Sequence, residues 1–189
     1  MKTKPIKIVL FLVLVVGLTN CAIQKTTSTI VGCEYNEKTN TTDYFVLPYG
    51  AVTIPGKWEK TNYLTSSKQQ FFINRDSVTL AISFGRFDKY EFNRNGEKSG
   101  FEFIKSFYEW DSNYFVESHG LKRQSLVADS TNNFTIYRIY GEKVTANFDT
   151  YFLVAEKKGD IANFSISHVK KWEESEKINF LKTLLLTRK

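Results

Sequence analysis

Three runs in the second half of the chain decide the fold: FTIYRIYG at Phe134–Gly141, FDTYFLVA at Phe148–Ala155 and IANFSIS at Ile161–Ser167. In the last run apolar and polar side chains alternate, which is the pattern of a strand with one buried face. Together with residues 122–128, the runs predict four strands in series. The polar turns between them are too short for the crossover that parallel neighbours need, so we expect antiparallel pairing.

Further strand-forming segments precede this series, at residues 44–47, 51–54, 70–74 and 78–84. The first two are separated by Pro48 and Gly50, so they predict a strand pair or one broken strand that ends in a turn. The last segment alternates apolar and polar residues, as expected of a half-buried strand. The three residues between the last two segments fit a hairpin loop.

Between the two groups of strands the hydrophobic period changes, and Ser99–Phe115 is predicted to be an amphipathic helix. One side carries large rings, and such rings at helical spacing usually pack on a sheet. We therefore expect Phe107 and Trp110 to be core residues and not ligand contacts. The apolar stripe comprises Phe103, Phe107, Trp110 and Tyr114, and Glu102, Lys105, Glu109 and Ser112 are expected on the opposite face.

A second amphipathic helix is predicted over Trp172–Thr187, with Leu181 and Leu185 on its buried side. Its acidic residues lie near the start and its basic residues near the end, as the helix dipole favours. Each helix has one apolar stripe and so should cover part of a sheet. The predicted fold class is therefore α+β, an antiparallel β-sheet flanked by helices.

This order of elements, together with the segment VTIPGKW at Val52–Trp58, resembles the PsbP/Mog1-like fold from about Tyr44 to the end of the chain. The resemblance implies an α/β/α sandwich and a family whose characterised members are mostly binding or accessory proteins. It transfers no functional residue, because no site motif of that family occurs here. Cystatin-like and open-barrel folds remain alternatives.

The N-terminus has the features of a signal sequence: Lys2, Lys4 and Lys7, then an uninterrupted apolar run, then Leu18–Cys21. The last four residues resemble a lipobox, although Asn20 departs from the usual Gly, Ala or Ser. The apolar run is shorter than the roughly 20 residues of a membrane-spanning helix. We therefore expect residues 1–20 to be a signal peptide and Cys21 to be lipidated. Ordinary secretion or an uncleaved anchor are the alternatives.

Lipidation of Cys21 would place the protein in the bacterial cell envelope, and we expect it in the outer membrane. Residues 21–43 contain few large apolar side chains, which predicts a flexible tether. Residues 44–189 are then a single α+β domain. Without the signal, 23 basic and 20 acidic residues remain, and the basic ones do not form a tract. This balance argues against a nucleic-acid partner.

The chain offers few candidates for catalysis. If Cys21 is lipidated, Cys33 has no partner in the chain and is expected to be an inert tether thiol. His119 and His168 are the only histidines, and neither lies in a catalytic or metal-binding motif. No phosphate-binding glycine motif or calcium loop occurs. We therefore expect no catalytic residue, no metal and no cofactor.

These observations favour a membrane-tethered, non-enzymatic binding or accessory module of the cell envelope, with an envelope protein as partner and an unknown binding site. The alternatives are an immunity or inhibitor lipoprotein that blocks a toxin or hydrolase, and a hydrolase with a carboxylate site assembled by the fold.

In addition, Asp129-Ser130-Thr131 is similar to the O-glycosylation sites of some Bacteroidetes envelope proteins, which marks Ser130 as a possible acceptor. Asp76-Ser77-Val78 matches the same pattern.

Overall fold

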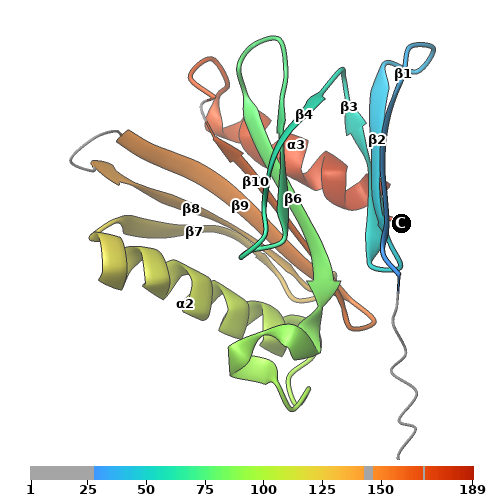
Figure 1. Cartoon of the computed structure of the whole chain (residues 1–189). Coiled ribbons are helices and arrows are strands. Elements are labelled where there is room, and N and C mark those ends of the chain that lie inside the picture. Colours follow the sequence, from blue (N-terminus) through green and yellow to red (C-terminus); the bar gives the residue numbers. More distant parts are fainter. Residues whose placement is uncertain (1–27, 143–146, 168) are drawn as a thin grey trace, which may run out of the picture.

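The computed structural model describes residues 28–142, 147–167 and 169–189 (Figure 1). Ten strands, two short 3-10 helices and two α-helices make up this part of the chain. In order they are β1 (Ile30–Asn36), β2 (Thr41–Leu47), β3 (Gly50–Pro55), β4 (Glu59–Leu64), β5 (Gln69–Ile73), β6 (Thr79–Arg86), η1 (Phe87–Lys89), η2 (Glu91–Asn93), α2 (Gly100–His119), β7 (Lys122–Asp129), β8 (Phe134–Glu142), β9 (Asn147–Lys157), β10 (Asp160–Ser167) and α3 (Glu174–Thr187).

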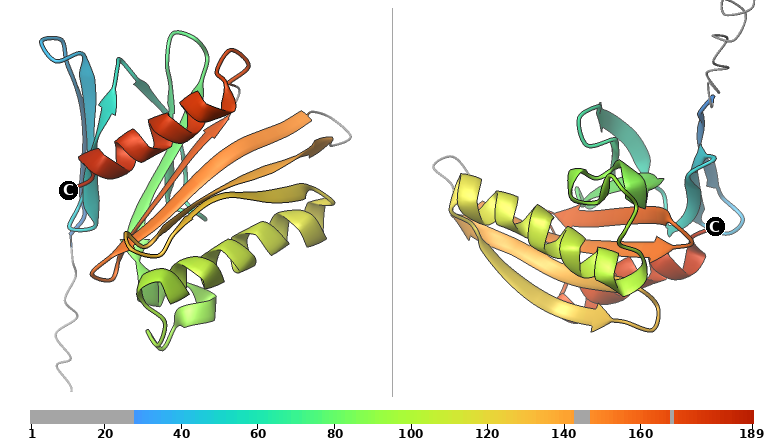
Figure 2. Two further views of the ribbon diagram at one scale, coloured as in Figure 1. Left: turned by 180° about the vertical axis from the view of Figure 1, so that it is seen from behind. Right: turned by 90° about the horizontal axis from the view of Figure 1, so that it is seen from below.

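Seven strands form one antiparallel sheet in the order β4-β5-β6-β10-β9-β8-β7. Successive residues on its strands point to two separate cores: Leu153 faces the core beneath α3, and Val154 faces the core beneath α2. Figure 2 shows the two helices on opposite sides of this sheet. The predicted α+β class, an antiparallel sheet flanked by helices, is confirmed. Helices on both faces fit neither a cystatin-like fold nor an open barrel.

A second, three-stranded sheet β1-β2-β3 stands beside the large one and packs on it through Tyr44, Val52 and Ile54. The prediction of a flexible tether over residues 21–43 is therefore wrong from Ile30 onward, because β1 and the start of β2 lie in that range. The edge strand β1 is held by its backbone ladder with β2, since none of its residues is buried. Thr42, in the central strand β2, is fully buried, although a composition-based argument treats such a residue as polar and exposed.

The strand β4 was not predicted, because all six of its residues are exposed and no alternation marks them. Its ladder with β5 is interrupted by a bulge between Lys60 and Tyr63. There the buried Gln70 side-chain amide donates to the carbonyls of Thr61 and Asn62, each at 3.1 Å. This side chain supplies the partners that the ladder does not, since buried backbone groups need them.

The helix α2 confirms Phe107 as a core residue but corrects two other expectations. Trp110 is 38% exposed, and its indole N–H donates to the Glu91 carboxylate. It lies at the margin of the core, where the ring packs on Tyr90 and Phe92 while its edge meets solvent. Ser112, expected on the polar face, is fully buried because strand β7 lies against that side of the helix.

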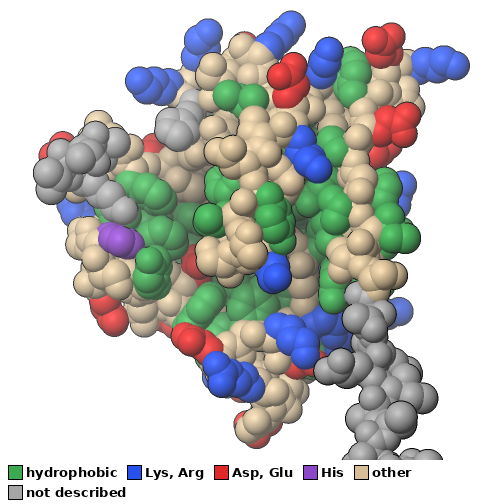
Figure 3. Space-filling model, in the orientation of Figure 1, with side chains coloured by type: hydrophobic (Ala, Val, Ile, Leu, Met, Phe, Trp, Pro, Cys, Tyr) green, Lys and Arg blue, Asp and Glu red, His purple; other side chains and the backbone are tan. Residues whose placement is uncertain are grey.

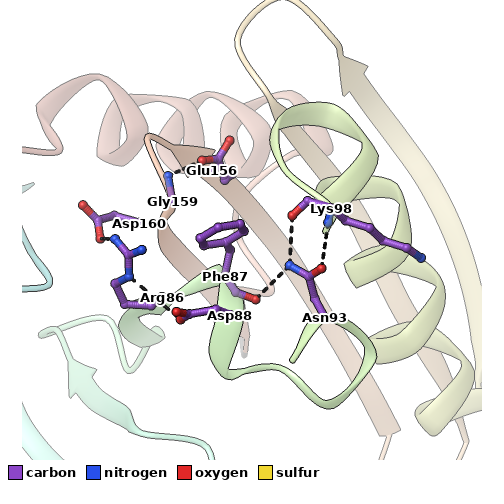
Figure 4. A network of polar contacts seen from close by, with 8 residues as sticks. All are labelled: Arg86, Phe87, Asp88, Asn93, Lys98, Glu156, Gly159 and Asp160. Carbon is purple, nitrogen blue, oxygen red and sulfur yellow. Dashed lines mark hydrogen bonds and ion pairs between the residues drawn. The ribbon is translucent and has the colours of Figure 1, made fainter. Parts of the chain in front are cut away.

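The start of α2 is held by strand β9, next to the polar contacts of Glu156 and Asn93 that Figure 4 draws. The buried Glu156 carboxylate accepts a hydrogen bond from the Gly100 N–H at 2.9 Å and another from the Gly159 N–H. Nearby, the Asn93 side chain bonds to the carbonyls of Phe87 and Lys98 and to the Lys98 N–H. These contacts fix the η1–η2 segment between β6 and α2.

The C-terminal helix α3 begins with a capping box between Glu173 and Glu176, which satisfies free N–H groups of its first turn. After the helix, Lys189 pairs with Ala51 through two backbone hydrogen bonds of 3.0 and 3.1 Å. The end of the chain thus closes the free edge of β3. Within the described residues, no helix is both long and apolar enough to cross a membrane.

Candidate functional site

The segment around Trp58 forms a rigid turn between the two sheets. Gly56 has a φ of +87°, a conformation that glycine adopts without steric cost. The Thr42 hydroxyl accepts a 3.0 Å hydrogen bond from the Trp58 N–H and donates one of 2.8 Å to the Gly56 carbonyl. The Trp58 indole N–H closes the turn on the Pro55 carbonyl at 2.8 Å. These three hydrogen bonds hold the Trp58 ring and backbone in place at the bend.

This turn forms one wall of a hollow of about 640 Å³, which lies between it, the β1–β2 turn and the β5–β6 turn. The volume falls in the range of ligand-binding clefts. We call it the Trp58 hollow. Its lining residues are Tyr35, Asn40, Pro55, Gly56, Lys57, Trp58, Glu59, Ile73, Asn74, Arg75 and Asp76.

The walls of the Trp58 hollow are fixed before any ligand binds. The Tyr35 hydroxyl donates to the Asn40 side-chain oxygen at 3.0 Å, which joins the two ends of the β1–β2 turn. The Asn74 side-chain oxygen accepts from the N–H groups of Asp76 and Val78, both at 3.0 Å, and thereby shapes the β5–β6 turn. A preformed wall lowers the entropic cost of binding.

Charged groups of both signs line the Trp58 hollow: Lys57 and Arg75 are basic, Glu59 and Asp76 acidic. In the described part of the chain none of the four makes an ion pair within 4 Å. The Lys57 ammonium lies 5.5 Å from the centre of the Tyr35 ring. The arrangement can therefore hold a ligand by ion pairs of both signs and by aromatic contact.

The residues singled out from the sequence do not meet at one site. Cys21 and His168 lie outside the described residues. His119 is the last residue of α2 and packs edge-on against the Tyr114 ring, with centroids 5.2 Å apart. Across residues 28–142, 147–167 and 169–189, no group of three or more His, Cys, Asp or Glu side chains gathers in metal-binding geometry.

Cys33 and Ser130 occupy exposed positions in ordered elements. Cys33 lies in β1, not in a tether, and partial burial raises the pKa of its thiol while the Lys60 charge opposes that shift. Ser130 is exposed in the β7–β8 turn. That turn is shaped by the Asp129 carboxylate, which accepts from the N–H groups of Thr131 and Asn132 at 2.9 Å each. Ser130 stays a predicted glycosylation site.

A half-buried carboxylate of α2, that of Asp111, faces the sheet away from the Trp58 hollow. Burial raises the pKa of Asp111 to about 6, while a 2.6 Å hydrogen bond from the Tyr137 hydroxyl opposes the shift. The same burial, together with the nearby Asp111 charge, raises the pKa values of Tyr137 and Tyr90. One carboxyl thus titrates near neutral pH among phenols that stay protonated.

Sequence reasoning missed both Asp111 and the charged lining of the hollow. The signal for Asp111 is its position four residues after Phe107 and four before Phe115, which places an acid on the apolar stripe of the helix. The lining of the hollow had no such signal. Tyr35, Lys57 and Arg75 come from three separate turns, and only the tertiary structure brings these turns together.

Comparisons with known proteins leave the family open. No family model matches the chain, and no curated protein matches it. Among solved structures, a protein of Bacteroides thetaiotaomicron is similar at 9% identity and a TM-score of 0.40, over 75% of this chain and 44% of that one. The chain therefore spans less than half the length of that protein.

A cyanobacterial PsbP (CyanoP) of Synechocystis is similar at 14% identity and a TM-score of 0.41, over 92% of this chain and 98% of that one. Its name is that of the PsbP family, whose fold the sequence resembles. Scores this low support no conclusion about function. The fold described above rests on the strand pairing and the two cores of this chain.

Proposed function

We propose that the protein is a membrane-tethered binding module of the bacterial cell envelope that holds a segment of a partner protein in the Trp58 hollow, without turnover of its own. The single observation that carries the proposal is the hollow itself, a preformed cleft with unpaired charges of both signs. The predicted lipidation of Cys21 supplies the tether.

A peptide segment fits this chemistry better than an apolar small molecule. A peptide presents carbonyl and N–H groups along its length together with charged side chains of either sign. Lys57 and Arg75 would meet its carboxylates, and Glu59 and Asp76 its basic side chains. The Tyr35 ring adds an aromatic contact of the kind that is enriched at protein interfaces.

The proposal is tested by photo-crosslinking in the living cell. A photoreactive residue at Lys57 should give a discrete protein adduct, whereas one at the exposed Lys122 on the far edge strand β7 should not. In the protein that carries the photoreactive residue at position 57, Arg75→Glu should remove the adduct. The matched charge reversal Lys122→Glu should not affect the adduct. Identical adducts from both positions, or an adduct indifferent to Arg75→Glu, would refute binding in the hollow.

A further inference from the structure

The outward face of the sheet β1-β2-β3 is apolar at one end and polar at the other. Ile30 and Leu47 lie opposite each other in the ladder and are 60% and 46% exposed. Beside them the Phe45 ring covers Gly32, so closely that a Cβ at Gly32 would overlap the ring. Further along the same face the Thr53 hydroxyl donates to the Asp43 carboxylate. The apolar end is the end at which the chain enters β1.

Lysine residues lie at this same end of the molecule. Lys157 at the end of β9 and Lys158 in the β9–β10 turn are exposed. Lys89 is exposed in η1, whose first N–H bonds to the Gly159 carbonyl in that turn at 3.0 Å. Gly50, at the start of β3, lies against the Phe84 ring near the end of β6. Figure 3 shows Lys and Arg side chains gathered beside the point where the grey N-terminal segment leaves.

The acids Glu156, Asp160 and Asp88 near this surface have partners within the domain, and Asp88 lies 3.9 Å from Arg86. Both oxygens of Glu156 accept backbone N–H groups, and Asp160 pairs with Arg86 at 3.4 Å (Figure 4). In the part of the chain that the structure describes, neither Lys157 nor Lys158 makes an ion pair within 4 Å. The end of the domain therefore presents lysine charge next to exposed apolar side chains.

We infer that this surface, formed by Ile30, Leu47, Lys89, Lys157 and Lys158, rests on an anionic phospholipid bilayer. The inference builds on the proposed membrane tether. Cys21 precedes Ile30 by nine residues, which span at most about 30 Å when extended, so this end of the domain stays within reach of the membrane. The apolar pair would enter the interfacial region, and the lysines would meet anionic headgroups.

Docking at this end would orient the Trp58 hollow. Ile30, Leu47 and Gly50 form one end of the three-stranded sheet, whereas Tyr35, Asn40 and Pro55 at its other end line the hollow. The six residues of β3 separate the two ends by about 17 Å. A domain that rests on its apolar end therefore presents the hollow away from the lipid, open to a partner.

The test uses the lipidated full-length protein in two kinds of vesicle, one of phosphatidylcholine alone and one with added phosphatidylglycerol. Hydrogen exchange is measured in both at two protein-to-lipid ratios. Backbone amides in residues 30–33 and 156–160 should exchange more slowly in the anionic vesicles, and those of residues 122–125 on β7 should not change. The double variant K157E/K158E and the single variant Leu47→Asp should each abolish the difference, while Lys122→Glu should preserve it.

Each lysine near an anionic surface strengthens adsorption by about fivefold, so the double variant should lower the docking equilibrium constant well over tenfold. The substituted residues are exposed, so the variants should fold. Thermal unfolding of each variant verifies this. Equal exchange in both vesicles would overturn the docking while retention on vesicles still supports the tether. If the slowing of exchange depends on the protein-to-lipid ratio and not on lipid charge, docking on lipid would also be overturned. The surface would then bind a second copy of the chain. A protein that does not stay on vesicles at all refutes the tether itself.

Discussion

The Tyr137 hydroxyl donates a 2.6 Å hydrogen bond to the Asp111 carboxylate, and this pair joins helix α2 to the central sheet. Burial raises the pKa of Asp111 from its ordinary 3.8 to about 6. Because the folded state holds this proton more tightly than the unfolded state, the Asp111 contribution to stability is greatest at low pH. It is lost as the pH rises through 6.

Asp111→Asn should therefore flatten the pH dependence of stability. Between pH 7 and pH 5 the free energy of unfolding of the natural protein should rise by about 1 kcal/mol relative to the variant, because one pKa unit corresponds to about 1.4 kcal/mol. Urea denaturation of both proteins at the two pH values measures the difference. Parallel pH profiles would show that Asp111 is ionised in the folded state well below pH 6.

Tyr137→Phe removes the hydrogen bond and leaves a buried carboxylate without that donor. We expect a loss of about 1–3 kcal/mol in the free energy of unfolding at pH 7. The loss should be smaller at pH 5, where Asp111 is largely protonated. A loss that is the same at both pH values would mean that the Tyr137 hydroxyl stabilises the fold equally whether or not Asp111 is ionised.

The two aromatic residues of α2 should respond differently to truncation. Phe107 is 1% exposed, so Phe107→Ala should cost about 3–5 kcal/mol of the free energy of unfolding. Trp110 is partly exposed, so Trp110→Ala should cost clearly less. Chemical denaturation of both variants checks the order. Equal costs would mean that the margin at Trp110 is as tightly packed as the core.

Removing β1 and the start of β2 should damage the domain. A fragment of residues 44–189 loses the β1 ladder and the Thr42 hydroxyl that closes the Trp58 turn. We expect this fragment to unfold at a lower denaturant concentration than residues 28–189, with a free energy of unfolding lower by about 2 kcal/mol or more. Equal denaturation midpoints for the two fragments would mean that residues 30–43 do not stabilise the domain and act only as a tether.

Cys21 is predicted to be the lipidated first residue of the mature chain. Intact-mass analysis of the protein extracted from membranes should show a chain that begins at Cys21 and carries acyl groups. Cys21→Ser should release the protein from the membrane fraction, because the acyl chains are the proposed source of stable residence. A mature chain that starts elsewhere, or that lacks acyl mass, contradicts the prediction.

The sequence alone determined the strands and helices whose residues repeat at a regular period. Leu80, Ile82 and Phe84 alternate along β6, and Phe103 and Phe107 recur along α2, so the sequence identifies these core-facing residues. The expectation that β6 is only half-buried is wrong, because Ala81 and Ser83 on its other face are buried as well. Acidic residues likewise marked the start of α3, whereas the expected basic residues do not lie in its last turn. These signals are local, because side-chain periodicity depends only on the geometry of a single element.

The tertiary structure decided everything that depends on which segments meet. The strands β1 and β4 have no periodic burial, since their stability comes from ladders with β2 and β5 that sequence proximity does not reveal. The Trp58 hollow combines Tyr35, Lys57 and Arg75 from three turns. Asp111 acquires its raised pKa only when α2 covers Tyr137, because desolvation is a property of the packed interface and not of the residue.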